Sequence, residues 1–268
     1  MDAQEIITSR DNAKLKFARA VRDGRESGIF VEGVRLVREA FRSRIEIEHL
    51  LVSADLAETE KRLEISELIE NTCLKITKVA SNLFSSIADT ANSQGVIALA
   101  RRPIWTLEDL DLSERGPVIF LQKVNNPSNL GAVVRTAEAA GAIGLIVSDS
   151  SSDAFSPKAN RASMGSCFRL PIIEGVEFEE AIMWARENGL ISTAADISAT
   201  DSYSEIDWSI SRLLVFGSEA HGLDRRELSK IEQVIRVPME NNVESLNLAV
   251  SAGIILFEAK RQAGVIKR

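Results

Sequence analysis

The chain has 268 residues, of which 45% are hydrophobic and 26% charged, and its formal net charge is −7 at pH 7. This composition is ordinary for a globular protein of one large or two small domains, and no apolar run is long enough to span a bilayer. The first 44 residues nevertheless carry ten basic and seven acidic side chains. A local basic surface can bind phosphate even on an acidic protein, although the same pattern is also that of a solvated helix face.

Cysteine and histidine are scarce. Cys73 and Cys167 lie in different halves without a CxxC motif, and the chain has two histidines. Because structural zinc sites take their ligands from closely spaced pairs and these residues are isolated, we expect no metal and interpret both cysteines as buried thiols in a reducing compartment. The first residues lack the basic-then-apolar layout of a signal peptide. We therefore expect a cytoplasmic protein without a membrane partner.

Residues 1–102 alternate short helical and extended patterns, which predicts a small α/β/α layer domain. Ser9 or Asp11 can cap the first helix, which is predicted to end near Asp23. The further predicted helices are 33–43, 58–71 and 81–88, and the predicted strands are 28–31, 47–52, 74–79 and 96–100.

Residues 103–115 begin with a proline, are acidic and irregular, and are predicted to be a linker. The strand 118–121 that follows is fully apolar, which is typical of a parallel strand covered on both faces. Strands and helices then alternate in a way that predicts a parallel sheet over 116–268. The further strands are 145–147, 169–172, 190–194, 213–216 and 234–237, and the helices are 130–140, 157–162, 178–187, 224–230 and 246–262.

Three short polar blocks lie where an apolar strand gives way to an apolar helix. They read N-P-S-N-L-G-A-V-V-R-T-A at 126–137, L-V-F-G-S-E-A-H-G-L at 214–223 and V-E-S-L-N-L-A-V-S-A-G-I at 243–254. Ligands of open α/β sheets bind at such junctions. The second block lacks the G-x-G-x-x-G spacing, which argues against a dinucleotide-dependent oxidoreductase.

Each block also has a purely structural explanation. Asn129 and Ser245 can cap the helices that follow them, and Glu219 suits the positive end of a helix dipole. Arg135 has the neighbours of an ordinary surface residue of a helix. Gly217 permits close approach of a ligand to the backbone, but it also suits a tight turn.

In this order and spacing, the three blocks resemble the SpoU (TrmH-type) family of RNA 2′-O-ribose methyltransferases over most of residues 116–262. The resemblance implies a trefoil-knotted, parallel-sheet C-terminal domain of the SPOUT type, S-adenosylmethionine as the cofactor, and a homodimer. Backbone groups near Gly217, Val237 and Leu246 would hold the cofactor. His221 departs from the small residue that the family usually has there.

The resemblance also implies a catalytic site, in which Arg135 faces the active site of the partner subunit. Its members are Asn129, Arg135, Glu219, Ser245 and Asn247. The sequence leaves two roles open for Arg135. It either accepts the proton of the ribose 2′-hydroxyl, or it binds the developing alkoxide or a neighbouring phosphate while water takes the proton.

The N-terminal part resembles the substrate-binding domain often attached to these enzymes, which looks like an RNA-binding ribosomal protein. This likeness rests on S-R-D-N-A-K-L-K at 9–16 and F-V-E-G-V-R-L-V at 30–37. It implies Lys14, Arg35 and Arg38 as contacts to RNA phosphates. Because aromatic residues make up 5% of the chain, we expect recognition of RNA shape and 2′-hydroxyls rather than extensive base stacking.

The predicted organisation is thus an RNA substrate-binding domain at 1–102, a linker at 103–115 and a methyltransferase domain at 116–268. The expected activity is S-adenosylmethionine-dependent 2′-O-methylation of a ribose in structured RNA, with ribosomal RNA favoured by the separate N-terminal domain. A tRNA 2′-O-methyltransferase and a non-catalytic RNA-binding ribosome-assembly factor of the same fold are the alternatives.

Overall fold

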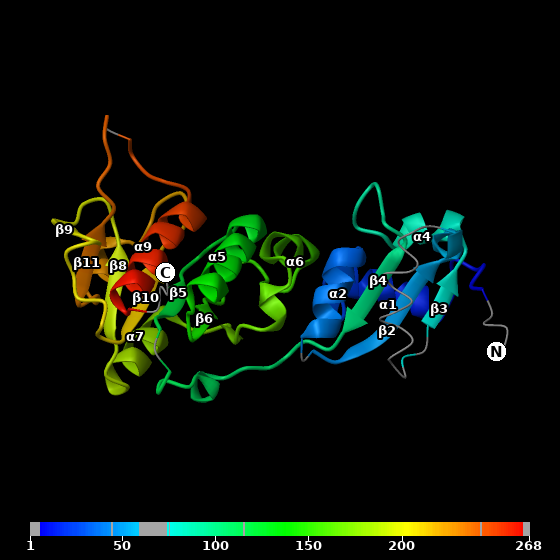
Figure 1. The fold of residues 1–268 in the computed structure, drawn as a ribbon, viewed down its shortest axis with the longest axis horizontal. Helices are drawn as coiled ribbons and strands as arrows, with labels where there is room; N and C mark the ends of the chain where they lie inside the picture. The colour runs from blue at the N-terminus through cyan, green and yellow to red at the C-terminus, as the bar shows by residue number, and fades with distance from the viewer. Residues whose placement is uncertain are drawn as a thin grey trace. The chain divides into compact units, whose positions relative to one another are not determined.

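A computed structural model describes residues 6–43, 45–58, 74, 76–114, 116–241 and 243–264 (Figure 1). The chain forms two compact units, one of Met1–Pro103 with Phe155–Arg169 and one of Ile104–Ala154 with Leu170–Arg268. We call them the N-terminal and C-terminal units. Residues 59–71 of the helix predicted at 58–71, and Cys73, lie outside the described residues. Within the described ranges, no helix is both long and apolar enough to cross a membrane.

The N-terminal unit contains a four-stranded sheet in the order β1-β4-β2-β3, in which β4 is antiparallel to both its neighbours and β3 is parallel to β2. The predicted α/β character of this part is confirmed. Its elements are α1 (Ala13–Arg22), β1 (Ile29–Glu32), α2 (Val34–Arg42), β2 (Ile47–Ser53), the 3₁₀ turn η1 (Ala54–Glu58), β3 (Ile76–Val79), α4 (Ser81–Ile87) and β4 (Val96–Ala100).

The core of the N-terminal unit forms where α1 and α4 contribute apolar side chains to the sheet. Leu15 of α1 and Phe84 of α4 pack with Phe30, Leu51 and Ile97 from three strands. The cap predicted for α1 is wrong, because the side chain of Asn12, and not of Ser9 or Asp11, accepts the hydrogen bond from the backbone N–H of Lys14.

The segment Phe155–Arg169 belongs to the N-terminal unit although it lies far along the chain. It holds α6 (Pro157–Ser163) and the 3₁₀ turn η3 (Ser166–Phe168). Asn160 is 1% exposed and donates to the carbonyl oxygens of Phe30 (3.3 Å) and Phe155 (2.9 Å), while its Oδ1 accepts from the Cys167 thiol at 3.0 Å. The polar groups of this buried amide are thus satisfied, and they tie α6 to β1.

The C-terminal unit is built on a seven-stranded parallel sheet in the order β7-β6-β5-β10-β8-β11-β9. This confirms the predicted parallel sheet. Its elements are η2 (Leu107–Asp109), β5 (Val118–Leu121), α5 (Pro127–Ala140), β6 (Gly144–Val147), β7 (Ile172–Glu174), α7 (Phe178–Glu187), β8 (Ile191–Ala195), β9 (Asp201–Ser202), β10 (Arg212–Phe216), α8 (Arg225–Leu228), β11 (Gln233–Arg236) and α9 (Leu248–Gln262).

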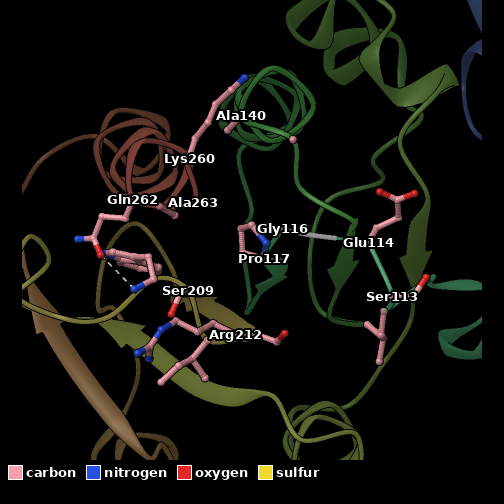
Figure 2. A pocket seen from close by; sticks show the side chains of 16 residues that line it. Ser113, Glu114, Gly116, Pro117, Ala140, Ser209, Arg212, Lys260, Gln262 and Ala263 are labelled. Carbon is pink, nitrogen blue, oxygen red and sulfur yellow. Dashed lines mark hydrogen bonds between the residues drawn. The ribbon is translucent and has the colours of Figure 1, made fainter. Parts of the chain in front are cut away.

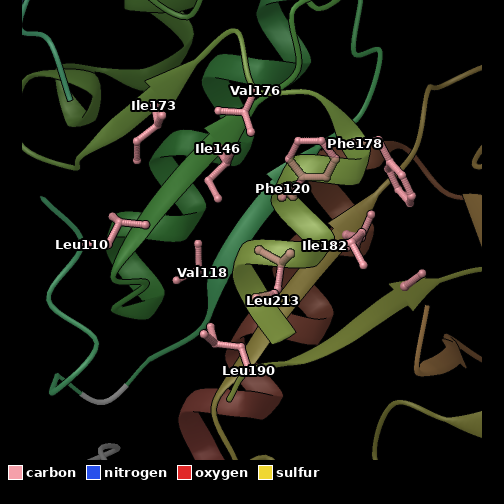
Figure 3. Packing of buried hydrophobic residues seen from close by; sticks show 14 of the residues in the cluster. Leu110, Val118, Phe120, Ile146, Ile173, Val176, Phe178, Ile182, Leu190 and Leu213 are labelled. Carbon is pink, nitrogen blue, oxygen red and sulfur yellow. The ribbon is translucent and has the colours of Figure 1, made fainter. Parts of the chain in front are cut away.

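Helices cover both faces of this sheet. Val118 and Phe120 of β5 pack with Phe178 and Ile182 of α7, and Figure 3 shows these side chains between α7 and the strands, with α9 on the far side. Since successive side chains of a strand alternate between faces, the equally buried Ile119 and its neighbours point to the face of α9. Coverage on both faces explains why β5 is apolar at every position.

The strand predicted at 169–172 is placed too early. The structure has η3 at Ser166–Phe168, and β7 begins at Ile172. Arg169 instead forms an ion pair with Glu39 at 2.9 Å inside the N-terminal unit. The predicted range therefore crosses the boundary between the two units, because the residues from Leu170 onward belong to the C-terminal unit. The two-residue strand β9 has no periodic pattern and was not predicted.

Replacing Asn160 by alanine should destabilise the N-terminal unit, because it removes the hydrogen bonds that the buried amide donates to two carbonyl oxygens. We expect the free energy of unfolding, measured by urea denaturation of the full chain, to fall by about 1–3 kcal/mol. The exposed Lys158 of the same helix is the control, and Lys158→Ala should change it by less than about 0.5 kcal/mol. Equal stability of the two variants would contradict the anchoring role of Asn160.

Candidate active site

Helix α5 begins one turn earlier than predicted. Pro127 is its first residue, and the side chain of Asn126 caps it by accepting from the backbone N–H of Ser128 at 2.9 Å. Proline suits the first helical position because its missing N–H has no partner there in any case. The prediction of Asn129 as the cap is therefore wrong, and the Asn129 side chain is available for other contacts.

Asn129 joins the three polar blocks. Its Nδ2 donates to Glu219 Oε1 at 3.1 Å, and its Oδ1 accepts from Asn247 Nδ2 at 3.0 Å. The Glu219 carboxylate also accepts from the backbone N–H groups of Asn125 (3.4 Å) and Asn126 (3.3 Å). We call this chain of hydrogen bonds the Asn129 network. It places one residue of each block, 90 and 118 residues apart in sequence, in direct contact.

A tight loop after β10 presents Glu219 to this network. Ser218 and Gly222 exchange backbone hydrogen bonds in both directions, at 3.1 and 2.9 Å. A Cβ atom on Gly217 would lie 2.2 Å from the backbone of Gly222, so this position requires glycine. His221 is exposed, and its backbone N–H donates to the Ser218 hydroxyl at 3.2 Å. The loop therefore turns on glycines and leaves Glu219 at its tip.

Helix α9 contributes Asn247 to the network. The Oδ1 of Asn247 accepts from the backbone N–H of Ala249 at 2.9 Å, which makes Asn247 the cap of α9. Ser245, predicted as the cap, is exposed and lies two residues earlier. One amide thus performs two tasks, because its oxygen caps the start of α9 while its nitrogen donates a hydrogen bond to Asn129.

Two of the three residues predicted to hold a cofactor lie at the carboxyl edge of the sheet. Gly217 follows β10 and Val237 follows β11, and β8 lies between these strands. The carboxyl ends of parallel strands share an edge, so Gly217 and Val237 lie about 10 Å apart there, the width of two strand spacings. Leu246 directly precedes Asn247, and both Val237 and Leu246 are half-buried.

Asp196 is a residue of this edge that the sequence did not single out. It follows β8, and its backbone N–H donates to the carbonyl oxygen of Ile235 at 2.9 Å. Its Oδ1 accepts from the backbone N–H and hydroxyl of Ser198 at 2.8 and 2.6 Å. Only the strand order β10-β8-β11 reveals its position, because no local motif marks it.

Arg135 does not join the Asn129 network within the chain. It is exposed on α5, six residues after Asn129, which corresponds to about 9 Å along the helix and about 120° around its axis. Among the residues that the structure describes, Arg135 has no hydrogen-bond or ion-pair partner. The structure therefore brings together Asn129, Glu219 and Asn247, and leaves Arg135 pointing elsewhere.

The candidate RNA contacts lie in the N-terminal unit. Lys14 is exposed, and its Nζ donates to the Thr77 hydroxyl at 3.0 Å. Arg35 is exposed and Arg38 half-buried, both on α2. Lys14 thus approaches β3 while the two arginines lie on a separate helix, so the structure does not group the three into one cluster.

A buried acid fixes the loop between β5 and α5 from the other side. Glu227 of α8 is 8% exposed, and its Oε1 accepts from Gln122 Nε2 at 2.7 Å and Lys123 Nζ at 2.9 Å. Its Oε2 accepts from the backbone N–H of Asp224 at 2.8 Å. Lys123 has a φ of +55°, a left-handed conformation that side chains other than glycine rarely adopt. The Glu227 contacts hold this strained residue in place.

These contacts shift two ionisation equilibria. Burial raises the pKa of Glu227, but hydrogen bonds from Gln122, the Asp224 backbone and Lys123 outweigh burial and leave the pKa below its ordinary value. The hydrogen bond from Lys123 to Glu227 raises the pKa of Lys123. Both groups are therefore charged around neutral pH, and the pair is stabilised as ions.

A cavity of about 430 Å³ lies at the other edge of the sheet. Figure 2 shows residues that line it, among them Pro117, which precedes β5, Arg212, which begins β10, and Ala140 and Lys260 near the ends of α5 and α9. Its position at the amino ends of the strands separates it from the Asn129 network by the length of β5. Within the described residues, no group of histidine, cysteine or acidic side chains could hold a metal ion.

Comparison with protein families agrees with the order of the three blocks. The model of the SpoU rRNA methylase family matches residues 116–257, and that of the RNA 2′-O ribose methyltransferase substrate-binding domain matches residues 30–105. The chain belongs to the SpoU rRNA methylase family. The methylase match contains all three blocks, and the Asn129 network joins one residue of each.

Individual relatives support this membership. The 23S rRNA (guanosine(2553)-2′-O)-methyltransferase RlmP of Bacillus subtilis is 28% identical over 95% of this chain and 98% of its own. The AdoMet-bound rRNA methyltransferase of Sinorhizobium meliloti is 30% identical, with a TM-score of 0.83 over 96% of this chain and 97% of its own. The A. aeolicus TrmH/SpoU tRNA modifying enzyme is 25% identical, with a TM-score of 0.51 over 57% of this chain and 77% of its own.

This SpoU chain is an RNA 2′-O-methyltransferase that uses S-adenosylmethionine. Its C-terminal unit has the SPOUT-type methyltransferase fold, and its N-terminal unit carries the substrate-binding domain. The oxidoreductase and non-catalytic alternatives are thereby rejected. The trefoil knot, the individual roles of the site residues and the location in the cytoplasm stay predictions.

Replacing Glu227 by glutamine should destabilise the protein in a pH-dependent way. Because the folded-state pKa of Glu227 is lowered, its carboxylate contributes stability above the ordinary pKa, and this contribution is lost as the pH falls through the folded-state value. We expect Glu227→Gln to lower the free energy of unfolding by about 1–3 kcal/mol at pH 7 and by clearly less below about pH 4. Urea denaturation at several pH values measures both.

The exposed Glu240 provides the control for this experiment. Glu240→Gln should leave stability unchanged within about 0.5 kcal/mol at every pH. If Glu227→Gln lowered the free energy of unfolding by the same amount at pH 7 and at pH 3.5, the shape of Glu227 and not its charge would be what stabilises the protein.

Proposed function

We propose that this chain transfers the methyl group of S-adenosylmethionine to the 2′-hydroxyl of a ribose in ribosomal RNA, and specifically in the RNA of the large subunit. The observation that carries the proposal is the Asn129 network at the carboxyl edge of the sheet, beside Gly217 and Val237. The rRNA enzymes align with both units of the chain, whereas the tRNA-modifying relative aligns with 57% of it. This difference favours ribosomal RNA over tRNA.

The residues at the carboxyl edge fit S-adenosylmethionine. Gly217 permits the tight turn after β10, and the half-buried Val237 and Leu246 offer apolar surface for an adenine ring. Residues 237–239 and 244–246 belong to no helix or strand, so their backbone groups are available for hydrogen bonds. S-adenosylmethionine, when bound, supplies a methyl group that its sulfonium charge has already activated.

Asn129 then orients the groups around the ribose. Its amide is fixed at both ends, by Glu219 and by Asn247, so it cannot rotate freely. Three N–H groups donate to the Glu219 carboxylate, which makes Glu219 a positioning residue for Asn129 and for the loop before α5. The exposed Ser245 hydroxyl is left to bind the ribose. Pre-organised contacts of this kind can lower a barrier by roughly 7–11 kcal/mol when they hold reactants at attack distance.

Arg135 supplies the positive charge, and we infer that it does so for the other subunit of a homodimer. Its direction on α5, about 120° from that of Asn129, carries its guanidinium away from its own network. Val250 and Phe257, seven residues apart on α9, are 50% and 45% exposed, as expected of a helix face that a second copy covers. An arginine is a permanent cation under physiological conditions. Arg135 therefore binds the developing alkoxide or a neighbouring phosphate, and water takes the proton.

Replacing Arg135 by alanine should abolish methylation while the cofactor still binds. Transfer of tritiated methyl groups to an unmodified 23S rRNA transcript measures the first, and calorimetry with S-adenosylmethionine measures the second. Arg135→Lys should also fail, because an ammonium group cannot form the paired hydrogen bonds of a guanidinium. Near-normal turnover of Arg135→Ala would remove Arg135 from the catalytic site.

Mixing two inactive variants tests whether Arg135 acts across a dimer. A heterodimer of Arg135→Ala and Asn129→Ala has one fully intact site only if each site takes Arg135 from the other chain. After co-refolding, random pairing should restore about a quarter of wild-type activity. Activity no greater than that of either variant alone would assign Arg135 to the site of its own chain.

A further inference from the structure

A second cavity, of about 490 Å³, lies entirely within the N-terminal unit. Three segments form its walls: the start of α2, the loop between α4 and β4, and α6. They contribute Arg35 and Leu36, Asn92 and Gln94, and Arg161 and Met164, respectively. The third segment is unexpected, because Arg161 lies outside residues 30–105, which match the substrate-binding domain.

The cavity is rich in donors of hydrogen bonds. Arg35 is exposed, and among the described residues it has no hydrogen-bond or ion-pair partner. The Oε1 of Gln94 accepts from the backbone N–H of Val34 at 2.8 Å. This contact uses the oxygen of the Gln94 amide and leaves its N–H₂ group to donate. Two guanidinium groups and a free amide therefore line one hollow, and Leu36 and Met164 provide apolar surface beside them.

Two acids lie in this region, and Glu32 also lines the cavity, but both are bound to groups other than Arg35. Glu32 is 8% exposed, and its carboxylate accepts from the backbone N–H groups of Asp89 and Thr90 at 2.8 and 3.1 Å and from the Thr90 hydroxyl at 2.7 Å. Asp89 forms an ion pair with Arg161. Arg161 is thus the one group in the cavity that a carboxylate already occupies, and its side chain is still 37% exposed.

We propose that this cavity binds a phosphate group of the RNA substrate through Arg35 and Arg161, with Asn92 and Gln94 beside the flanking nucleotide. The proposal rests on the function proposed above and assigns to α6 a part in substrate binding. Guanidinium groups bind phosphate oxygens in pairs of parallel hydrogen bonds. Contacts to phosphates position a protein on nucleic acid, and an amide next to them can read the edge of an unpaired base.

The ion pair between Arg161 and Asp89 competes with phosphate binding. For Arg161 to bind a phosphate, it must share or leave the Asp89 carboxylate, which is also a like charge beside the incoming anion. Removing that charge should therefore strengthen binding of RNA. If the Arg161–Asp89 pair served only to stabilise the fold, removing either partner would act in the same direction.

The test is binding of an unmodified 23S rRNA transcript to the full chain at several salt concentrations, measured by filter binding. Arg161→Ala and Arg35→Ala should each weaken binding about tenfold and lower the slope of log K against log salt by roughly 0.7–1. Asp89→Asn should bind the transcript more tightly than wild type. Thermal unfolding of each variant verifies that it folds.

Arg169 provides a matched control from the same segment. It also forms an ion pair with Glu39 inside the N-terminal unit, and its side chain is 35% exposed, but it does not line the cavity. Arg169→Ala should retain the wild-type salt slope. Equal losses for Arg161→Ala and Arg169→Ala, or weaker binding by Asp89→Asn, would overturn the proposal.

Because RNA binding and methyl transfer are measured separately, the experiments distinguish a wrong substrate from a wrong phosphate site. A wild-type chain that binds the transcript without methylating it would overturn the proposed substrate alone. Wild-type binding by Arg35→Ala and Arg161→Ala, with methylation intact, would overturn the phosphate site alone.

Discussion

The Glu219 carboxylate is the group on which the geometry of the methyltransferase site depends. It accepts hydrogen bonds from the backbone of Asn125 and Asn126 and from the side chain of Asn129, and Asn129 in turn binds Asn247. Hydrogen bonds to an ionised acceptor are stronger than neutral ones. A single acid at the tip of an exposed loop thereby fixes the start of α5 and, through one amide, the start of α9.

A second acid of the same chain segment supports this arrangement from within the protein. Glu219 and Glu227 both follow β10, and they bind opposite ends of the loop from Gln122 to Asn126. Glu227 is buried and holds Lys123 in a left-handed conformation. Strain of this kind persists only where the surroundings over-determine it. The loop before α5 is therefore held rigidly on both sides, as a site that must align two reactants requires.

The two units of the chain do not coincide with the two family matches. The methylase match covers residues 116–257, yet Phe155–Arg169 packs in the N-terminal unit through the buried amide of Asn160 and the ion pairs of Arg161 and Arg169. A segment that belongs to the methylase match by sequence thus forms part of the unit that carries the substrate-binding domain. This sharing gives a physical reason for keeping both units on one chain.

Local pattern was sufficient for much of the fold. The strands at 96–100 and 118–121 and the helix at 178–187 lie where the sequence predicts them, because apolar periodicity reports directly which faces are buried. The three polar blocks likewise mark their own positions, because polar residues and glycine between an apolar strand and an apolar helix indicate a site. Even the family follows from these short motifs.

Only the tertiary structure determined the features that depend on contacts between distant segments. The caps of α5 and α9 are Asn126 and Asn247, and only their partners show why Asn129 is free to bind Glu219. The strand order places Asp196 at the carboxyl edge of the sheet, and the fold brings Arg35 and Arg161, which are far apart in the chain, to the lining of one cavity. Periodicity within a segment carries information about which face is buried. It carries none about which distant segment covers that face, because that choice is made by packing and hydrogen bonding in the folded chain.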